Sequence, residues 1–343
     1  MDKLIIAGTR KSAGKTTIFT GLGKAMGKKV AYMKPFGDRL IYRKKRLWDY
    51  DAALLTNVFG LEENPEDITI GFEHAKLRYV YDEERVKEKL HEIANNVGKN
   101  KDMLFVEGGR DLAYGVSVYL DAISVANYLG GKLVLVVGGN DDNIIDDIVL
   151  FKKYVDVSSI DFAGVIINRI HDLEDFKNTY LEKIKEMGVN VIGMIPYVPD
   201  LSHFTMDYLS ESLFAKVIAG ETGLNSVVKN IFVGAMSSNE ALRNPMFNKD
   251  DKLLITSGDR SDMILSGLET NTAGIILTNN ILPPSNIISK ASERNIPLLL
   301  VSSNTYQVAS QLEKMEALLT KDNTEKISQI EKLIADHVDV KML

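Results

Sequence analysis

The most informative absences in this sequence are those of cysteine, of a long apolar run and of excess positive charge. No cysteine occurs among the 343 residues, which excludes disulfides, thiolate metal sites and thiol nucleophiles and fits a reducing cytoplasm. No run reaches the roughly 18 apolar residues that a membrane span requires, and the first apolar run begins too early for a signal peptide. The net charge of −6 argues against general affinity for nucleic acid or anionic membranes. We therefore expect a cytoplasmic protein without nucleic-acid or membrane partners.

The remaining composition is that of a soluble globular protein. Hydrophobic residues make up 45% of the chain and charged residues 26%, which are ordinary values. The five histidines are scattered, so the sequence predicts no transition-metal cluster. The length is sufficient for two domains with separate hydrophobic cores.

The N-terminal segment carries the strongest functional signal. Residues 4–8 predict a buried strand, residues 8–17 (GTRKSAGKTT) a phosphate-binding loop, and the residues that follow a helix. Backbone N–H groups of such a loop and the helix N-terminus attract an anion. Lys15 offers a positive charge to the β- and γ-phosphates, and the Thr16 hydroxyl can ligate Mg²⁺. The residues predicted to contact the nucleotide from this segment are Gly8, Thr9, Ser12, Ala13, Gly14, Lys15, Thr16 and Thr17.

Strand patterns alternate with helix patterns after this loop. The predicted strands cover residues 29–33, 103–106, 132–137, 162–167 and 191–195, and the predicted helices residues 50–60, 83–97, 120–130, 142–154 and 174–187. Such alternation predicts a three-layer α/β domain with a mostly parallel sheet. Ligands of these domains bind at the carboxyl ends of the strands, where the phosphate-binding loop lies.

A second, smaller α/β domain is predicted after a glycine-rich break at residues 219–226. The predicted strands there are residues 230–233, 252–256, 273–277 and 297–301, with helices between them. The last helix carries Ile327, Ile330, Leu333 and Ile334 on one face. We therefore predict two domains, residues 1–219 and residues 226–343.

Several polar residues fall where ligands are expected. Glu107 follows a buried strand and precedes two glycines, which favours a metal-ordering acid over a solvated carboxylate. Lys34 ends the second strand and points toward the same edge of the sheet, which favours a functional residue over a plain surface lysine. Asp49 and Asp51 stand at the start of a helix, where aspartate is often an N-terminal cap, so the residues alone leave open which one faces a metal. Asn168 ends another strand and either contacts an adenine edge or closes a turn.

A basic stretch at residues 39–46 has two interpretations. It is either a solvated loop or a mobile loop over an anionic substrate or the phosphates.

Five motifs together resemble the dethiobiotin synthetase family over roughly residues 1–215. They are GT(x)4GKT from residue 8, MKP at 33–35, DA at 51–52, EGG at 107–109 and GVIIN at 164–168. The similarity is to the branch that also forms the N-terminal part of long bacterial phosphate acetyltransferases. It implies that Thr16, Asp51 and Glu107 surround Mg²⁺, that Lys15 and Lys34 contact the phosphates and a substrate carbamate, and that Asn168 and Pro196 lie near the adenine. Lys15, Lys34 and Glu107 are then the implied catalytic residues.

The second domain resembles a DRTGG domain. Residues 255–262 and 272–278 carry the similarity, with DRSDM at 259–263 where the family has DRTGG. The turn at residues 258–261 has two interpretations, a small-anion site that includes Arg260 or a helix cap with a surface salt bridge.

Two functions remain open from the sequence. The first is an enzyme, ligase-like or an ATPase, that uses Mg·ATP to activate a carboxylate or carbamate of a small substrate. The second is a regulatory module that binds ATP and acts through the DRTGG-like domain on a protein partner. A third option, a partner-switching ATPase, requires a lysine where this chain has Arg10. Amidation driven by a glutaminase cysteine is excluded, and we expect a homodimer.

Overall fold

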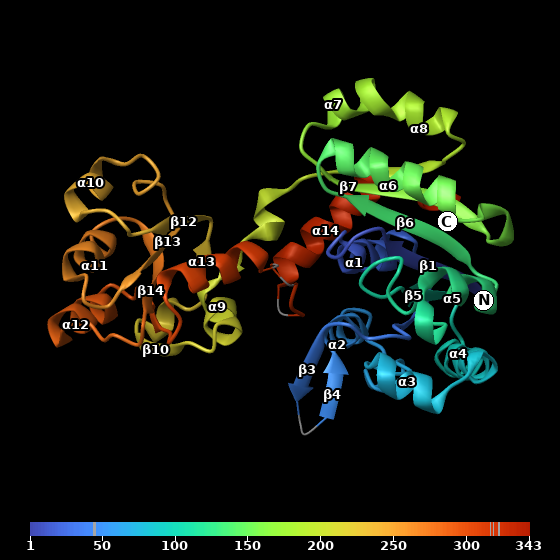
Figure 1. Cartoon of the computed structure of the whole chain (residues 1–343), viewed down its shortest axis with the longest axis horizontal. Helices are drawn as coiled ribbons and strands as arrows, with labels where there is room; N and C mark the ends of the chain where they lie inside the picture. The colour runs from blue at the N-terminus through green and yellow to red at the C-terminus, as the bar shows by residue number, and fades with distance from the viewer. Residues whose placement is uncertain (44–45, 316, 318, 322) are drawn as a thin grey trace. The chain divides into compact units, whose positions relative to one another are not determined.

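A computed structural model describes residues 1–43, 46–315, 317, 319–321 and 323–343. This part of the chain divides into two compact units (Figure 1). Unit 1 contains Met1–Tyr197 and Leu319–Leu343, and unit 2 contains Val198–Leu318.

Unit 1 is built on a six-stranded sheet in which every neighbouring pair is parallel. The strand order is β2-β5-β1-β6-β7-β8. The strands are β1 (Asp2–Gly8), β2 (Val30–Met33), β5 (Met103–Glu107), β6 (Lys132–Gly138), β7 (Phe162–Ile170) and β8 (Val191–Pro196). Continuous apolar runs form these strands because helices cover the sheet. The predicted parallel α/β fold is confirmed.

Helices flank this sheet (Figure 1). They are α1 (Lys15–Ala25), α2 (Tyr50–Val58), α3 (His74–Val80), α4 (Glu83–Val97), α5 (Ala122–Leu129), α6 (Asp141–Tyr154), α7 (Leu173–Phe176), α8 (Glu182–Glu186) and α14 (Thr324–His337). Side-chain caps start several of them, as when Asp82 accepts the Arg85 N–H ahead of α4 and Asn140 accepts the Asn143 N–H ahead of α6.

Helix α14 is part of unit 1, which differs from the predicted second domain at 226–343. It lies beside α1 (Figure 1), and its Ile330 and Ile334 are 2% and 0% exposed. A Cβ atom on Gly21 of α1 would lie 2.2 Å from Ile334 Cγ1. The apolar stripe of α14 predicted that this helix is buried on one face. Which surface it packs against depends on the close approach of α14 to Gly21 of α1.

Unit 2 contains a five-stranded sheet of order β10-β15-β14-β13-β12, in which only the β10–β15 pair is antiparallel. Its strands are β10 (Lys216–Ala219), β12 (Asn230–Val233), β13 (Lys252–Ser257), β14 (Thr272–Thr278) and β15 (Leu298–Leu300), with the short pair β9 (Phe204–Thr205) and β11 (Val227–Val228). Its helices are α9 (Met206–Ser212), α10 (Ser238–Arg243), α11 (Ser261–Leu268), α12 (Ser285–Glu293) and α13 (Thr305–Lys314).

Unit 2 also starts earlier than the predicted boundary at 219–226. Met206 and Leu209 of α9 are fully buried in one core with Leu253 and Ile255 of β13. Because α9 and β10 complete this core and this sheet, residues from Val198 onward fold with unit 2.

The basic stretch at residues 39–46 contributes to two paired strands of unit 1. Strands β3 (Leu40–Arg43) and β4 (Arg46–Asp49) pair in antiparallel fashion, and the Arg46 guanidinium pairs with Glu66. Lys44 and Lys45 lie outside the described residues. Neither interpretation as an open loop anticipated this pairing.

Within the described ranges, no helix combines the length and the apolar character that crossing a bilayer would need.

Candidate functional site

The loop between β1 and α1 depends on two glycines for its shape. Gly14 has φ +102°, and a Cβ atom there would lie 2.1 Å from Asn168 Nδ2. A Cβ atom on Gly8 would lie 3.0 Å from the Arg10 carbonyl oxygen and 3.6 Å from Lys15 Nζ. The glycines therefore let the loop close over itself, with the Lys15 ammonium folded back beside it.

The loop is held from two neighbouring elements. Asn168, at the end of β7 and 4% exposed, donates from Nδ2 to the Ala13 carbonyl oxygen at 2.9 Å. Asp147 of α6 accepts the Thr9 hydroxyl at 2.7 Å and two guanidinium hydrogens of Arg10, from Nε to Oδ2 and from Nη2 to Oδ1, each at 2.9 Å. A bidentate pair of this kind fixes orientation as well as charge. Arg10 is thus bound within its own chain.

The N-terminus of α1 presents the positive end of the helix dipole without a capping side chain. Gly14 is its N-cap, no side chain caps it, and no acidic residue lies in its first turn. The Lys15 side chain is 8% exposed, and among the residues that the structure describes no carboxylate pairs with its Nζ atom. Burial lowers the pKa of Lys15. A buried lysine that has no carboxylate partner among the described residues, at an uncapped helix N-terminus, is typical of an anion-binding site.

Lys34 lies at the centre of an acidic cluster and is 1% exposed. Its Nζ atom is 2.7 Å from an oxygen of Asp51, 2.7 Å from Asp38, 3.3 Å from Asp49 and 3.7 Å from Glu107. Burial works to lower the pKa of Lys34, but the four carboxylates outweigh it and raise that pKa well above its ordinary value. The four carboxylates therefore favour the charged form of Lys34.

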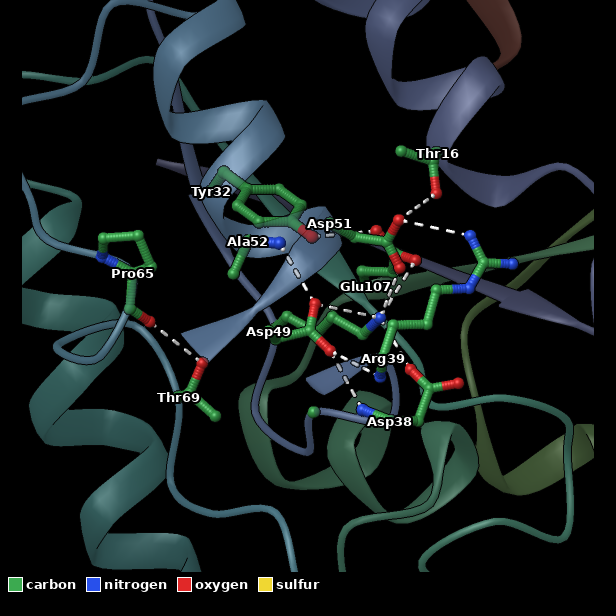
Figure 2. A network of polar contacts seen from close by, with 12 residues as sticks. Thr16, Tyr32, Asp38, Arg39, Asp49, Asp51, Ala52, Pro65, Thr69 and Glu107 are labelled. Atoms are coloured by element: carbon green, nitrogen blue, oxygen red, sulfur yellow. Dashed lines mark hydrogen bonds and ion pairs between the residues drawn. The ribbon is translucent and has the colours of Figure 1, made fainter. Parts of the chain in front are cut away.

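Asp51 connects this cluster to the phosphate-binding loop (Figure 2). Its Oδ1 atom accepts the Thr16 hydroxyl at 3.0 Å and is 3.4 Å from Arg39 Nη1, whereas its Oδ2 atom pairs with Lys34. Burial works to raise the pKa of Asp51, but Lys34 and Arg39 outweigh it and the pKa falls to about 2. Asp51 is therefore ionised at neutral pH.

Asp49 has a different set of partners. Its Oδ1 atom accepts the Ala52 N–H at 3.1 Å, which caps α2, and its Oδ2 atom accepts the Asp38 and Arg39 N–H groups at 2.9 and 3.0 Å. Asp49 thus shapes the backbone around the cluster, while Asp51 faces the Thr16 hydroxyl.

Glu107 ends β5 and is 1% exposed. Its Oε2 atom accepts the Tyr32 hydroxyl at 2.8 Å, and its Oε1 atom faces Lys34. Burial raises the pKa of Glu107 to about 7, although the Lys34 ammonium opposes this shift. Tyr32 was not among the predicted site residues, although it lies in β2 two positions before Lys34, which directly follows that strand, and such spacing places side chains on one face of extended chain.

The oxygen donors around Thr16 fit a magnesium ion. A hydroxyl and a carboxylate oxygen lie 3.0 Å apart at Thr16 and Asp51, and Glu107 Oε1 is 3.7 Å from the Lys34 Nζ atom with which Asp51 also pairs. Hard oxygen ligands of this kind suit Mg²⁺, which usually keeps several waters and binds through one or two protein ligands plus phosphates. The structure also brings three aspartate oxygens, of Asp38, Asp49 and Asp51, within 4.8 Å of one another.

The two residues expected near adenine lie at adjacent strand ends, Asn168 on β7 and Pro196 on β8, with Ile170 pairing to Pro196. Asn168 contacts the loop backbone, and its contact with a base stays a prediction. Asp38 belongs to the cluster and Arg39 contacts it. In the sequence Asp38 had no signal of its own, and Arg39 was noted only as part of the basic stretch.

The turn at 258–261 of unit 2 has its own internal partners. Arg260 donates from Nη2 to the Met236 carbonyl oxygen at 2.8 Å and pairs with Asp262 at 3.1 Å. These contacts include the surface salt bridge of the second interpretation, but the side chain of Arg260, the N-cap residue of α11, makes no capping hydrogen bond.

The parallel sheet, the loop after β1 and the helix that follows define a P-loop NTPase fold. The profile of the AAA domain family matches residues 2–205, more than half of the chain, and the chain belongs to this family. The DRTGG domain profile matches residues 208–315. The predicted order of a P-loop domain and a DRTGG domain is confirmed.

The chain is similar to several known proteins. The phosphate acetyltransferase of Nitratidesulfovibrio vulgaris is 25% identical over 366 residues, which cover 98% of this chain and 50% of that protein. The cobyrinate a,c-diamide synthase of Methanocaldococcus jannaschii is 27% identical over 209 residues, 57% of this chain and 40% of that protein. The MinD cell division protein of Aquifex aeolicus has a TM-score of 0.36 and 21% identity, and the match covers 59% of this chain and 84% of that one. The chain spans about half the length of the phosphate acetyltransferases that it matches.

Proposed function

We propose that unit 1 binds Mg·ATP at the loop after β1 and uses it to phosphorylate a carboxylate or carbamate of a small molecule. The observation that carries nucleotide binding is the Lys15 ammonium, which is nearly buried and has no carboxylate partner among the described residues. A triphosphate supplies oxygen atoms that pair directly with this ammonium.

The remaining site residues are proposed to have separate roles in phosphoryl transfer. Thr16 and Asp51 would hold Mg²⁺, with Glu107 as a further ligand, and the ion would neutralise charge on the phosphates. Lys34 supplies a fixed cation beside them, as the resemblance to dethiobiotin synthetases implies. Asn168 and Pro196 are proposed to border the adenine. The acceptor class rests on that resemblance, and the substrate itself is the unknown to be measured.

A second candidate function is a regulatory module that binds ATP with little turnover. The observation that favours it is the enclosure of Lys34, which is 1% exposed and contacts four carboxylates. A lysine so enclosed reaches a substrate only after the cluster rearranges. Unit 2, with its DRTGG domain, would then convey the nucleotide state to a protein partner.

Binding is tested by calorimetry of Mg·ATP with the full chain and with Lys15→Ala. Because hydrogen bonds to charged groups contribute about 1.5–3 kcal/mol, the loss should be roughly 10- to 100-fold in affinity. Lys11→Ala is the matched control, since Lys11 is an exposed lysine of the same loop. Equal affinity of wild type and Lys15→Ala would contradict the proposed site.

Turnover is tested by ADP release from Mg·ATP, with the protein alone and with fractionated small metabolites plus bicarbonate. A fraction that raises ADP release above that of Lys15→Ala supports the enzyme and reveals its substrate class. Tight binding without turnover under any addition supports the regulatory module instead.

A further inference from the structure

Arg39 and a magnesium ion require the same carboxylate. The Asp51 Oδ1 atom faces both the Thr16 hydroxyl at 3.0 Å and Arg39 Nη1 at 3.4 Å (Figure 2). A metal ion held by Thr16 and Asp51 must approach this same oxygen. Two cations at such distances repel strongly in a partly buried site, so Arg39 and the metal ion compete there.

The arginine is the cation that can leave. Lys34 is 1% exposed and enclosed by four carboxylates, whereas the Arg39 side chain is 23% exposed. The Arg39 backbone is nevertheless fixed on both sides. Its N–H donates to Asp49 Oδ2 at 3.0 Å, and its carbonyl oxygen accepts the Tyr50 N–H at 2.7 Å. A guanidinium displaced from Asp51 therefore stays within the length of one side chain of Thr16.

We propose that Arg39 occupies the place of the metal ion beside Asp51 in the ligand-free protein and moves to the terminal phosphate when Mg·ATP binds. This inference rests on the proposed nucleotide site and adds a second, movable cation to it. The incoming triphosphate carries the negative charge that the guanidinium loses when it leaves Asp51. A planar guanidinium binds two phosphate oxygens at once and can stabilise charge on a transferred phosphoryl group. Arg39 is then a nucleotide-contacting residue that distinguishes ATP from ADP.

The first test uses Mn²⁺ alone, titrated into the nucleotide-free full chain and followed by electron paramagnetic resonance of the free ion. Removal of the competing charge in Arg39→Gln should tighten Mn²⁺ binding by about tenfold, as expected for one charge at this range in a partly buried site. Arg46→Gln is the matched control. Arg46 lies on β4, whose partner strand β3 directly follows Arg39, and it has the same charge but pairs with Glu66 instead. Unchanged or weaker Mn²⁺ binding by Arg39→Gln would refute the claim that Arg39 and the metal ion compete for the position beside Asp51.

The second test compares the affinities for Mg·ATP and Mg·ADP. Arg39→Gln should lose about tenfold in affinity for ATP and keep its affinity for ADP, since only ATP has the terminal phosphate. An equal loss for both nucleotides would overturn the movement to that phosphate. Failure of the wild type to bind either nucleotide would refute the proposed function itself, and the Mn²⁺ titration would still decide whether Arg39 occupies the metal position.

Arg39→Lys covers the case in which Arg39→Gln does not fold. Lysine keeps one positive charge but lacks the planar pair of donors. It should leave Mn²⁺ affinity near the wild-type value and still reduce the preference for ATP over ADP. A wild-type preference for ATP in this variant would overturn the role of the guanidinium.

Discussion

Replacing Ile334 by alanine should destabilise unit 1, although this residue lies near the end of the chain. Ile334 is 0% exposed, and its Cγ1 atom would lie 2.2 Å from a Cβ atom on Gly21. Such large-to-small core substitutions cost about 2–5 kcal/mol. Because glycine has no side chain that could fill the space, we expect about 3–4 kcal/mol here. Helix α14 would then be an essential part of the nucleotide-binding unit.

The assay is urea unfolding followed by tryptophan fluorescence. Trp48 is the only tryptophan of the sequence and belongs to β4 of unit 1. With a slope of about 2–3 kcal/mol per molar urea, the midpoint should fall by roughly 1–2 M. Ile287→Ala is the matched control, since Ile287 is 1% exposed in the core of unit 2, and it should leave the Trp48 transition in place. A Trp48 midpoint that Ile334→Ala does not move would refute the packing of α14 on α1.

Two further predictions concern the loop and the acidic cluster. Gly14→Ala should abolish nucleotide binding, because φ +102° is strained for alanine by about 1–3 kcal/mol and the new Cβ atom would meet Asn168 at 2.1 Å; Gly27→Ala, with φ +60° and open space around it, should bind nucleotide like the wild type. Glu107→Gln should remove part of the pH dependence of stability. The pKa of Glu107 is about 7 in the folded chain and ordinarily 4.5, so its folded form holds a proton more tightly. Its stabilising contribution is full below pH 4.5 and is lost as the pH rises through 7, by up to about 3 kcal/mol. Urea unfolding of the nucleotide-free chain at pH 5 and pH 8 would check this. An equal change in the free energy of unfolding between the two pH values in wild type and Glu107→Gln would contradict it.

The parts of the fold that the sequence predicted are those determined by residues close together in the chain. The strand before the loop, the loop itself and helix α4 at Glu83–Val97 all follow from local apolar periodicity and from glycine positions. The carboxyl ends of parallel strands then had to meet at one edge, which placed Lys34 and Glu107 near the loop.

Contacts between distant segments were not predictable in this way. The stripe on α14 indicated burial but could not indicate which surface it covers, and only the backbone approach at Gly21 determines that. Strand β10 has four residues and pairs with β15, about eighty positions later, so the glycine-rich break that follows it does not mark the domain boundary. Local composition contains no information on such pairings.

The choice between Asp49 and Asp51 shows the same limit inside the site. Both residues stand at the start of α2, and only the folded structure shows that Asp49 accepts backbone N–H groups while Asp51 faces Thr16. The sequence did contain one unused signal, the hydroxyl of Tyr32 two residues before Lys34. Its hydrogen bond to Glu107 depends on the neighbouring positions of β2 and β5, which the strand order supplies.

The charges of the site explain why metal and nucleotide should enter together. Four carboxylates, those of Asp38, Asp49, Asp51 and Glu107, face the cations Lys34 and Arg39, with Lys15 close by. Because the pKa of Glu107 is about 7, its partial protonation brings the ligand-free site close to electrical balance. A divalent ion alone adds uncompensated positive charge beside Arg39, and a triphosphate alone adds negative charge beside four acids. Each should therefore bind more weakly by itself than in the presence of the other, since a buried unpaired charge is costly.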